Sequence, residues 1–324
     1  MAVKDAVLQA LEQARGKRLS GGQLAQQLGV SRAAVHKAID ALRSSGMAID
    51  GVPGEGYRLA PEDDSLTAAG VQALLDTRFV GREMVVLPSL SSTNTVIKER
   101  YLDRPHGFVL LAEEQTGGRG RLGRTFVSPA ETGVYQTILL HPTLPVGHIQ
   151  LATIAAAVAV AEAVTQTAGF SPEIKWVNDV LYEGRKLSGI LTEASIEGES
   201  GTVSSLLGGI GVNLRSNPAW PEDVRAVAGA LSEFGRTPRR AELAAAVLTH
   251  FERAYSLLEQ DRADKLLDLY RSRLCCLGKS IKVIGPAETY QADCIGLDGN
   301  GFLLVRDETG QTRTLSSGEI SIRF

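Results

Sequence analysis

The spacing of apolar residues changes character twice along this 324-residue chain, near residue 60 and again near residue 277. Residues 1–60 combine helical spacing with a glycine-rich hairpin pattern, residues 66–276 mix strand and helix patterns, and residues 277–324 hold short strand patterns. A chain of this length is expected to hold two or three domains. We therefore predict a multidomain α+β protein with domains at 1–60, 66–276 and 277–324.

The N-terminal segment is typical of a winged helix-turn-helix. Helical spacing predicts helices over 3–15, after the N-cap Ser20, and over 32–44, and residues 47–59 predict a hairpin that would form the wing. The segment carries a charge of +3 in a chain of net charge −3, which favours an anionic partner. DNA binding is the preferred interpretation, and a small protein-interaction domain is the alternative. The candidate DNA-contacting residues, at and along the third helix, are Ser31, Arg32, His36, Lys37 and Arg43.

The central segment alternates strand and helix patterns. Strands are predicted at 84–87, 108–112, 133–140, 173–177, 181–182, 189–194 and 206–212, with an alanine-rich helix at 151–167 and a helical region at 239–274. This pattern is typical of a mixed α/β domain. Beyond Gly278, short strand patterns and the hairpin signal at 298–301 predict a small β-barrel that ends in a strand at 320–323.

The cysteines and the apolar runs indicate in which cellular compartment the protein is expected. Cys275, Cys276 and Cys294 fit neither a disulfide framework nor a metal-ligand spacing, so we expect them to be buried and reduced. The N-terminus has no signal-peptide pattern, and the apolar run 151–161 stops at Glu162, too short to cross a bilayer. We expect a cytoplasmic protein without a membrane partner.

One loop carries the strongest functional signal. Residues 118–124 read Gly-Arg-Gly-Arg-Leu-Gly-Arg, in which glycine permits close backbone approach and arginine offers donors matched to phosphate and carboxylate oxygens. The glycines fit a dinucleotide fingerprint, but residues 125–129 are a poor first helical turn. A Walker-A loop at 278–280 fails because Arg273 replaces its first glycine. The remaining alternative is a flexible, solvated basic loop.

Five motifs in a fixed order make this chain resemble the bifunctional biotin–protein ligases and biotin-operon repressors (BirA type), and the likeness covers essentially the whole chain. The N-terminal segment resembles the winged helix of that family, and residues 318–323 resemble its terminal strand. The motifs are Ser91-Ser92-Thr93-Asn94, the loop 118–124, Lys175-Trp176-Val177-Asn178-Asp179, Lys186-Leu187-Ser188-Gly189-Ile190-Leu191 and Gly209-Ile210-Gly211-Val212-Asn213. Phe126 departs from the family, which usually has Trp there.

The resemblance implies a lipoate-ligase-like central domain, an SH3-like C-terminal β-barrel and a two-step reaction. Biotin and ATP, with Mg²⁺, would give biotinyl-5′-AMP, and a lysine of biotin carboxyl carrier protein would then take the biotin. Biotinyl-AMP would also act as the corepressor of a homodimer on operator DNA. Two alternatives are a ligase whose DNA domain no longer regulates and a biotin-sensing repressor that does not catalyse.

The resemblance also implies site residues, and their chemistry suits the reaction. Cations must offset the repulsion between a carboxylate and a triphosphate, and a buried ureido ring needs both donors and acceptors. The implied catalytic residues are Arg121 and Lys186. The implied biotin-binding residues are Ser92, Thr93, Asn94, Gln115, Arg119, Gly120, Arg121 and Lys186. The implied ATP- or adenylate-binding residues are Gly118, Arg119, Arg121, Arg124, Asn178, Asp179, Lys186, Asn213 and Trp220, with Mg²⁺ near Asp179.

Each of these motifs also has a structural interpretation. Residues 91–94 have the pattern of a plain helix N-cap, and Asn178-Asp179 that of a turn. Trp176 and Trp220 are equally compatible with packing in a core.

Overall fold

The computed structural model describes residues 2–142, 148–196, 202–218, 220–285, 288–316 and 319–321. The chain forms two compact units. The first contains the residues up to Asp76 together with Arg239–Ala246, and the second contains Thr77–Pro238 and the residues from Val247 onward.

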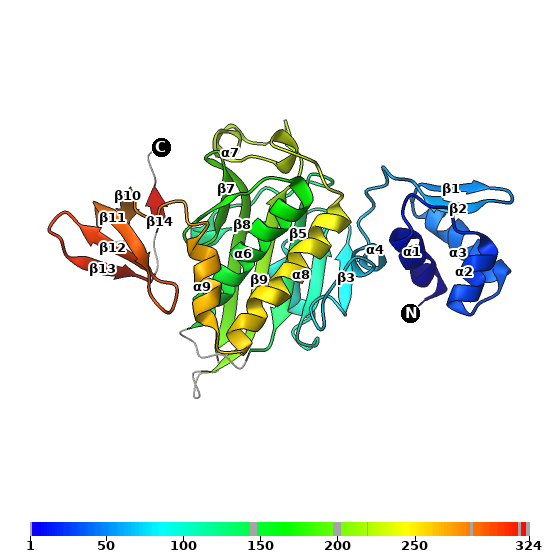
Figure 1. The fold of residues 1–324 in the computed structure, drawn as a ribbon, viewed down its shortest axis with the longest axis horizontal. Coiled ribbons are helices and arrows are strands. Elements are labelled where there is room, and N and C mark those ends of the chain that lie inside the picture. Colours follow the sequence, from blue (N-terminus) through cyan, green and yellow to red (C-terminus); the bar gives the residue numbers. More distant parts are fainter. Residues whose placement is uncertain are drawn as a thin grey trace. The chain divides into compact units, whose positions relative to one another are not determined.

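The first unit is the predicted winged helix-turn-helix (Figure 1). Its elements are α1 (Val3–Gln13), α2 (Gly21–Leu28), α3 (Arg32–Ser44), β1 (Ile49–Val52), β2 (Gly56–Leu59) and α4 (Ala68–Gln72). Ser20 and Gln23 form a capping box at the start of α2, and the Ser31 hydroxyl accepts the backbone N–H of Ala34 at 3.1 Å. The antiparallel β1–β2 hairpin is the wing. A core of apolar side chains from the three helices and the hairpin holds the unit together.

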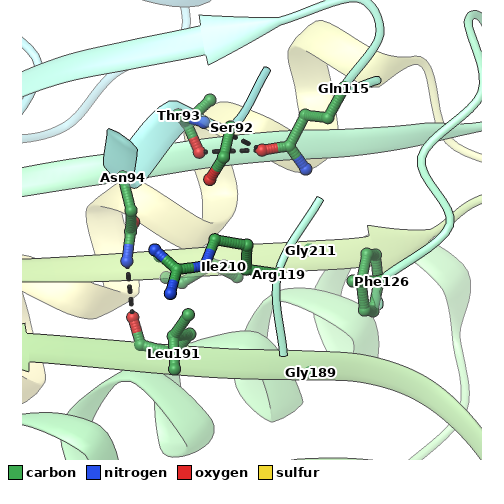
Figure 2. Close-up of a pocket in the computed structure, with 11 residues that line it drawn as sticks. Ser92, Thr93, Asn94, Gln115, Arg119, Phe126, Gly189, Leu191, Ile210 and Gly211 are labelled. Carbon is green, nitrogen blue, oxygen red and sulfur yellow. Dashed lines mark hydrogen bonds between the residues drawn. The ribbon is translucent and has the colours of Figure 1, made fainter. Parts of the chain in front are cut away.

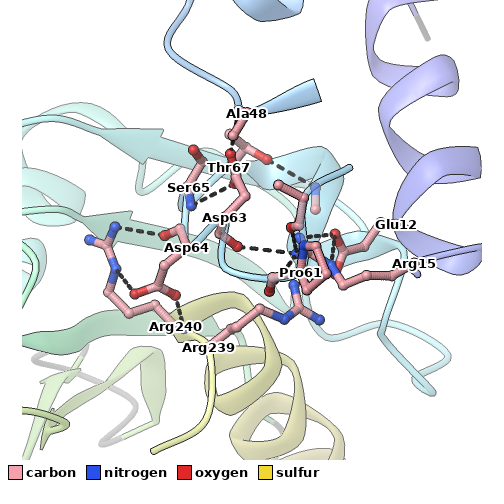
Figure 3. A network of polar contacts seen from close by, with 12 residues as sticks. Glu12, Arg15, Ala48, Pro61, Asp63, Asp64, Ser65, Thr67, Arg239 and Arg240 are labelled. Atoms are coloured by element: carbon pink, nitrogen blue, oxygen red, sulfur yellow. Dashed lines mark hydrogen bonds and ion pairs between the residues drawn. The ribbon is translucent and has the colours of Figure 1, made fainter. Parts of the chain in front are cut away.

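A polar network joins the segment after the wing, residues 61–64, to α1 and to Arg239 and Arg240, which belong to the same unit (Figure 3). The buried Glu12 pairs with Arg15 at 2.6 Å and with Arg239. Asp63 accepts the backbone N–H of Ala48 at 2.7 Å, and Asp64 accepts the backbone N–H of Arg240 at 2.6 Å. The acidic segment that follows the wing is therefore fixed by hydrogen bonds, together with the first turn of α8 (Arg240–Glu259).

A seven-stranded sheet forms the centre of the second unit. Only β3 and β4 pair in parallel; the other pairings are antiparallel. The strand order is β3 (Met84–Leu87), β4 (Phe108–Ala112), β5 (Gly133–Leu140), β9 (Val203–Asn213), β8 (Arg185–Ile196), β7 (Asp179–Tyr182) and β6 (Glu173–Lys175). The strands bear out the mixed α/β prediction.

Helices flank this sheet. α6 (Ile149–Ala168) contacts β6 to β9, and the Thr153 hydroxyl donates to Thr192 of β8 at 2.8 Å. α5 (Thr93–Arg100) contacts β4, β5 and β9, and a short helix α7 (Glu222–Val227) lies beyond β9 in the chain. The region predicted as helical at 239–274 is two helices, α8 and α9 (Ala263–Arg271), separated at Asp261 with its φ of 56°.

α6 corrects one expectation. The apolar run was predicted to be too short to cross a bilayer, yet the helix has 20 residues and passes that test by length and composition. However, 83% of the most apolar 18-residue stretch of this helix is buried inside the protein, as in the core helix of a globular domain.

The C-terminal part forms a five-stranded antiparallel sheet. Its strand order is β13 (Thr312–Leu315), β12 (Leu303–Asp307), β11 (Thr289–Leu297), β10 (Ser280–Ile284) and β14 (Glu319–Ser321). Over the described residues the edge strands β13 and β14 do not pair, so no closed barrel is found. The end of the predicted last strand, residues 322–323, lies outside the described residues.

The C-terminal sheet is anchored on the central sheet's helical layer. The Gly301 carbonyl accepts the Trp176 indole N–H at 3.0 Å and the Gln150 amide at 2.6 Å. The three cysteines are buried and free, as predicted, with the sulfurs of Cys276 and Cys294 3.5 Å apart.

Candidate active site

On one face of the central sheet, three glycines leave free the space that larger side chains would fill. A Cβ on Gly209 would lie 2.4 Å from Asn94 Oδ1, and one on Gly211 would lie 2.5 Å from Phe126. A Cβ on Gly189 would lie 3.1 Å from the Lys186 side chain. Because alternate residues of a strand share a face, these glycines form a floor opposite the face that α6 covers.

A small pocket lies on this floor (Figure 2). It encloses about 320 Å³ of empty space, part of it open to solvent. Ser92, Thr93 and Asn94 reach it from the start of α5, and Gln115, Arg119 and Phe126 reach it from the loops after β4. The lining is completed by strand residues, which are Gly189, Leu191, Gly209, Ile210 and Gly211. The structure thus brings five predicted biotin-contacting side chains together.

Hydrogen bonds fix most of these polar groups. Gln115 Oε1 accepts the Thr93 backbone N–H at 2.9 Å and its hydroxyl at 3.2 Å, while Gln115 Nε2 donates to Ser128 at 2.9 Å. The Thr137 hydroxyl lies 2.6 Å from Asn94 Oδ1. Ser92 stands at the N-cap position of α5, but its side chain makes no capping hydrogen bond although the residue is only 4% exposed. The Ser92 hydroxyl is therefore available to a ligand.

A second, larger cavity adjoins the first and shares Arg119, Phe126 and Gly189 with it. It holds about 2530 Å³ of empty space, again including the part open to solvent. Its lining contains most of the remaining predicted site residues, which are Gly120, Arg121, Arg124, Asn178, Asp179, Lys186, Asn213 and Trp220. Gly118 instead packs against the backbone of Phe126, where a Cβ would lie 2.2 Å from the carbonyl oxygen.

The cations of this cavity have partners inside it. Lys186 Nζ lies 2.8 Å from Asp179 Oδ1, and Arg121 donates to Asn178 Oδ1 at 3.0 Å. Asn178 in turn donates to the Ile190 carbonyl at 3.0 Å, so the arginine loop is tied to strand β8. Of these two cations, Lys186 lies beside Gly189, a residue that both cavities share.

Two other predicted site residues, Asn213 and Trp220, are almost completely buried. Asn213 is 6% exposed and donates to the carbonyls of Lys186 and Gly229 at 3.3 and 3.1 Å. Trp220 is 4% exposed and packs with Ala228 and Ala230. Its indole N–H has no partner among the residues that the structure describes. Both side chains shape the wall of the larger cavity.

Sequence reasoning missed Glu193, which lies on β8 two residues beyond the pocket residue Leu191. Its carboxylate accepts Asn94 Nδ2–H at 2.8 Å and pairs with Lys98 at 2.7 Å. Burial tends to raise the pKa of Glu193, but the hydrogen bonds from Lys98 and Asn94 lower it below its usual value. The alternation of residues 189, 191 and 193 on one strand face is the signal that identifies it.

The predicted DNA-contacting residues divide into two groups. Arg32, His36 and Lys37 are exposed on α3, and His36 lies 3.0 Å from Asp40. Arg43 donates to the Ile49 carbonyl at 3.0 Å and its guanidinium lies 5.9 Å from the centre of the Tyr57 ring. Arg43 thus links the third helix to the wing.

Comparison with known proteins agrees with this architecture. Residues 86–213 match the biotin/lipoate A/B protein ligase family, residues 4–58 an HTH domain and residues 276–323 the biotin protein ligase C-terminal domain. The bifunctional ligase/repressor BirA of Bacillus subtilis is 31% identical over 314 residues, covering 96% of both chains. That of Escherichia coli is 30% identical over 315 residues, covering 96% of this chain and 94% of its own length. Biotin protein ligase from Aquifex aeolicus in complex with biotin and ATP superimposes with a TM-score of 0.65 at 27% identity, over 75% of this chain and 99% of that one. The chain therefore belongs to the family of bifunctional biotin–protein ligases and repressors.

Proposed function

We propose that this protein joins biotin to a lysine of biotin carboxyl carrier protein through biotinyl-5′-AMP, and that it represses the biotin operon with the same adenylate as corepressor. The observation that carries the proposal is the pair of adjoining cavities, one small and lined mostly by uncharged polar groups and glycines, the other large and cationic, with Arg119 and Phe126 in both linings. Such a pair suits a molecule with a compact polar ring at one end and a nucleotide at the other.

The small pocket takes the ureido ring. Its free groups are the Ser92 hydroxyl, the second N–H of Gln115 and the remaining lone pair of Asn94 Oδ1. They offer both donors and acceptors to a ring that has both, and each buried group left unpaired would cost about 1–3 kcal/mol. Thr93 supports Gln115, and the backbone at Arg119 and Gly120 closes the pocket over the carboxylate tail.

The larger cavity takes ATP beside that tail. A biotin carboxylate oxygen attacks the α-phosphorus, the bond to pyrophosphate breaks, and biotinyl-AMP remains. Lys186 and Arg121 stabilise the negative charge of this step, with Arg119 and Arg124 as further donors in the loop. In the second step an uncharged lysine amine of the carrier attacks the acyl carbon, and AMP leaves.

Magnesium fits the cavity as part of MgATP. Magnesium ions are commonly held by one or two carboxylates together with substrate phosphates, and Asp179 supplies one carboxylate there. Among the described residues no cluster of three metal-ligating side chains occurs, so a dedicated protein cage is not part of the proposal. Bound Mg²⁺ would neutralise phosphate charge, while Asn178 holds Arg121 in place.

For repression, the exposed N-cap Ser31 and the exposed α3 residues Arg32, His36 and Lys37 approach DNA, and Arg43 supports them by fixing the wing. A palindromic operator requires a symmetric partner, so we propose a homodimer. We further propose the domain boundaries 1–60, 66–276 and 277–324, an SH3-like C-terminal domain and a cytoplasmic location.

The decisive test is biotin-dependent exchange between ATP and pyrophosphate by purified protein with magnesium, followed by the mass gain of a carrier protein. Exchange with biotin but not with lipoate is expected. Absence of exchange would leave the biotin-sensing repressor as the function. A gel shift with and without biotinyl-AMP separates the full proposal from a ligase whose DNA domain no longer regulates.

A further inference from the structure

Glu193 contacts Asn94, a residue that lines the small pocket, but Glu193 does not line the pocket itself. Its side chain is 21% exposed, and its two carboxylate oxygens are shared between Asn94 Nδ2 at 2.8 Å and Lys98 Nζ at 2.7 Å. The Arg119 guanidinium lies 4.0 Å away on the pocket side. The carboxylate thus joins three groups around the edge of the small pocket.

The contacts of Asn94 determine which way its amide points. The Glu193 carboxylate and the Leu191 carbonyl, at 2.8 and 3.1 Å, only accept hydrogen bonds, so both must face the amide N–H₂ (Figure 2 shows the Leu191 contact). The amide oxygen is then left above Gly209, where a Cβ would lie 2.4 Å from it, on the floor of the pocket. Thr137 donates to that oxygen at 2.6 Å, and one lone pair remains.

We infer that Glu193 is a positioning residue, which fixes the Asn94 amide so that its oxygen accepts a ureido N–H of bound biotin. This inference rests on the proposed function and adds a residue to it. Without an acceptor at position 193, only Leu191 would hold the N–H₂ side, and the amide would rotate or draw water into the pocket. The loss falls on biotin binding, because Glu193 is not in the lining of the nucleotide cavity and its contact with Arg119, which is, is long at 4.0 Å.

The position and the charge of Glu193 make separable contributions. A neutral Gln at 193 keeps an acceptor oxygen for Asn94 but loses the ion pair with Lys98. A Met of similar length keeps neither. If orientation is what matters, Glu193→Gln and Lys98→Met should each raise KM for biotin by less than about threefold, since a partly exposed ion pair is worth little. Glu193→Met should raise it by about tenfold, the effect of one hydrogen bond at a charged acceptor.

The assay is pyrophosphate exchange with biotin and ATP varied separately. For Glu193→Met we expect KM for ATP and kcat within twofold of wild type, since the lost interaction is made equally in the ground and transition states. The matched control is Glu162→Met on α6, which makes the same chemical change at an ion pair of 2.8 Å between Glu162 and Arg273. It should leave every kinetic constant unchanged. A parallel rise in both KM values, or no rise for biotin, would overturn the inference.

The contact between Asn94 and Glu193 can also be tested by exchanging its donor and its acceptor, so that the result does not depend on whether a single variant folds. Asn94→Asp places a carboxylate against Glu193, and we expect it to raise KM for biotin by about 100-fold or more. Adding Glu193→Gln supplies an N–H for Asp at 94 and should recover at least about tenfold of that loss. If the double variant is no better than Asn94→Asp alone, Glu193 does not act through Asn94. Lack of exchange by the wild-type protein would instead reject the proposed function.

Discussion

Gly209→Ala should close the small pocket while leaving the sheet intact. The new Cβ would lie 2.4 Å from Asn94 Oδ1, and contacts under 3.0 Å essentially never occur for a real Cβ. The Asn94 oxygen must therefore retreat by at least about 0.6 Å, which is large for a close-packed group. Alanine is compatible with the strand, because Gly209 is not among the glycines with positive φ.

The cost follows from what Asn94 would lose. Its amide makes hydrogen bonds of 2.6, 2.8 and 3.1 Å, and each contributes about 0.5–1.5 kcal/mol. Bonds within the protein are lost with and without biotin and therefore lower the stability. The lost contact to biotin, together with the methyl group that now fills the pocket, predicts a loss of about 2–3 kcal/mol in biotin binding, or about 30- to 150-fold. The measurement is biotin affinity by calorimetry, with thermal unfolding as the check on folding.

The neighbouring glycine provides the control. Gly208 points to the opposite face of the same strand, where an added Cβ would meet only the Ile138 carbonyl oxygen at 4.0 Å. Gly208→Ala should therefore bind biotin within about twofold of wild type, since a Cβ at ordinary contact distance costs little. Equal losses in the two variants would refute the argument that the glycine floor makes room for the ligand.

Three further predictions concern the cation site, the N-terminal unit and the DNA surface. Lys186→Ala should slow pyrophosphate exchange by about 10²- to 10³-fold without lowering the melting temperature, and an equal loss of stability would indicate a structural role instead. Glu12→Ala removes a buried carboxylate from two partly buried arginines, Arg15 and Arg239, and should destabilise the N-terminal unit by about 1–2 kcal/mol in urea unfolding, whereas Glu55→Ala, at an exposed ion pair, should cost less than about 0.5 kcal/mol. Arg32→Ala and Lys37→Ala should weaken operator binding in gel shifts and leave ligation unchanged; a parallel fall in ligation would contradict their placement on the DNA surface.

Local sequence signals predicted the regular elements well. The helix predicted over 32–44 begins and ends as the spacing and the Ser31 cap require, because both signals act within one or two turns. The C-terminal strands follow alternation that is visible in the sequence, whereas the central strand β4 is a continuous apolar run that is buried along its whole length. The helical region 239–274 was predicted without its break at Asp261, since no glycine or proline marks that position.

Contacts between residues far apart in the sequence could not be predicted from such local signals. Nothing local in residues 61–64 shows that Asp64 holds the backbone of Arg240, 176 positions later. In the same way, Glu193 appears in the sequence as one acid near the end of a strand. Its importance arises from the register of β8 against β9 and from the packing of α5 on that face, which bring Asn94 within 2.8 Å.

Strand β8 explains how one chain can align two substrates. Lys186 lines the larger cavity that we assign to the nucleotide, Gly189 belongs to both cavities, Leu191 lines the small pocket that we assign to the ureido ring, and Glu193 holds Asn94 beside it. The seven steps from Lys186 to Glu193 follow one strand, with a bulge at Leu187, and at about 3.3 Å per residue they span at most about 23 Å. Because side chains alternate between faces, a shift of one residue would turn Gly189, Leu191 and Glu193 toward α6 together. On the proposed assignment, the register of β8 against β9 therefore decides whether Gly189 and Leu191 face the two ligands, a constraint that loops such as 118–124 do not provide.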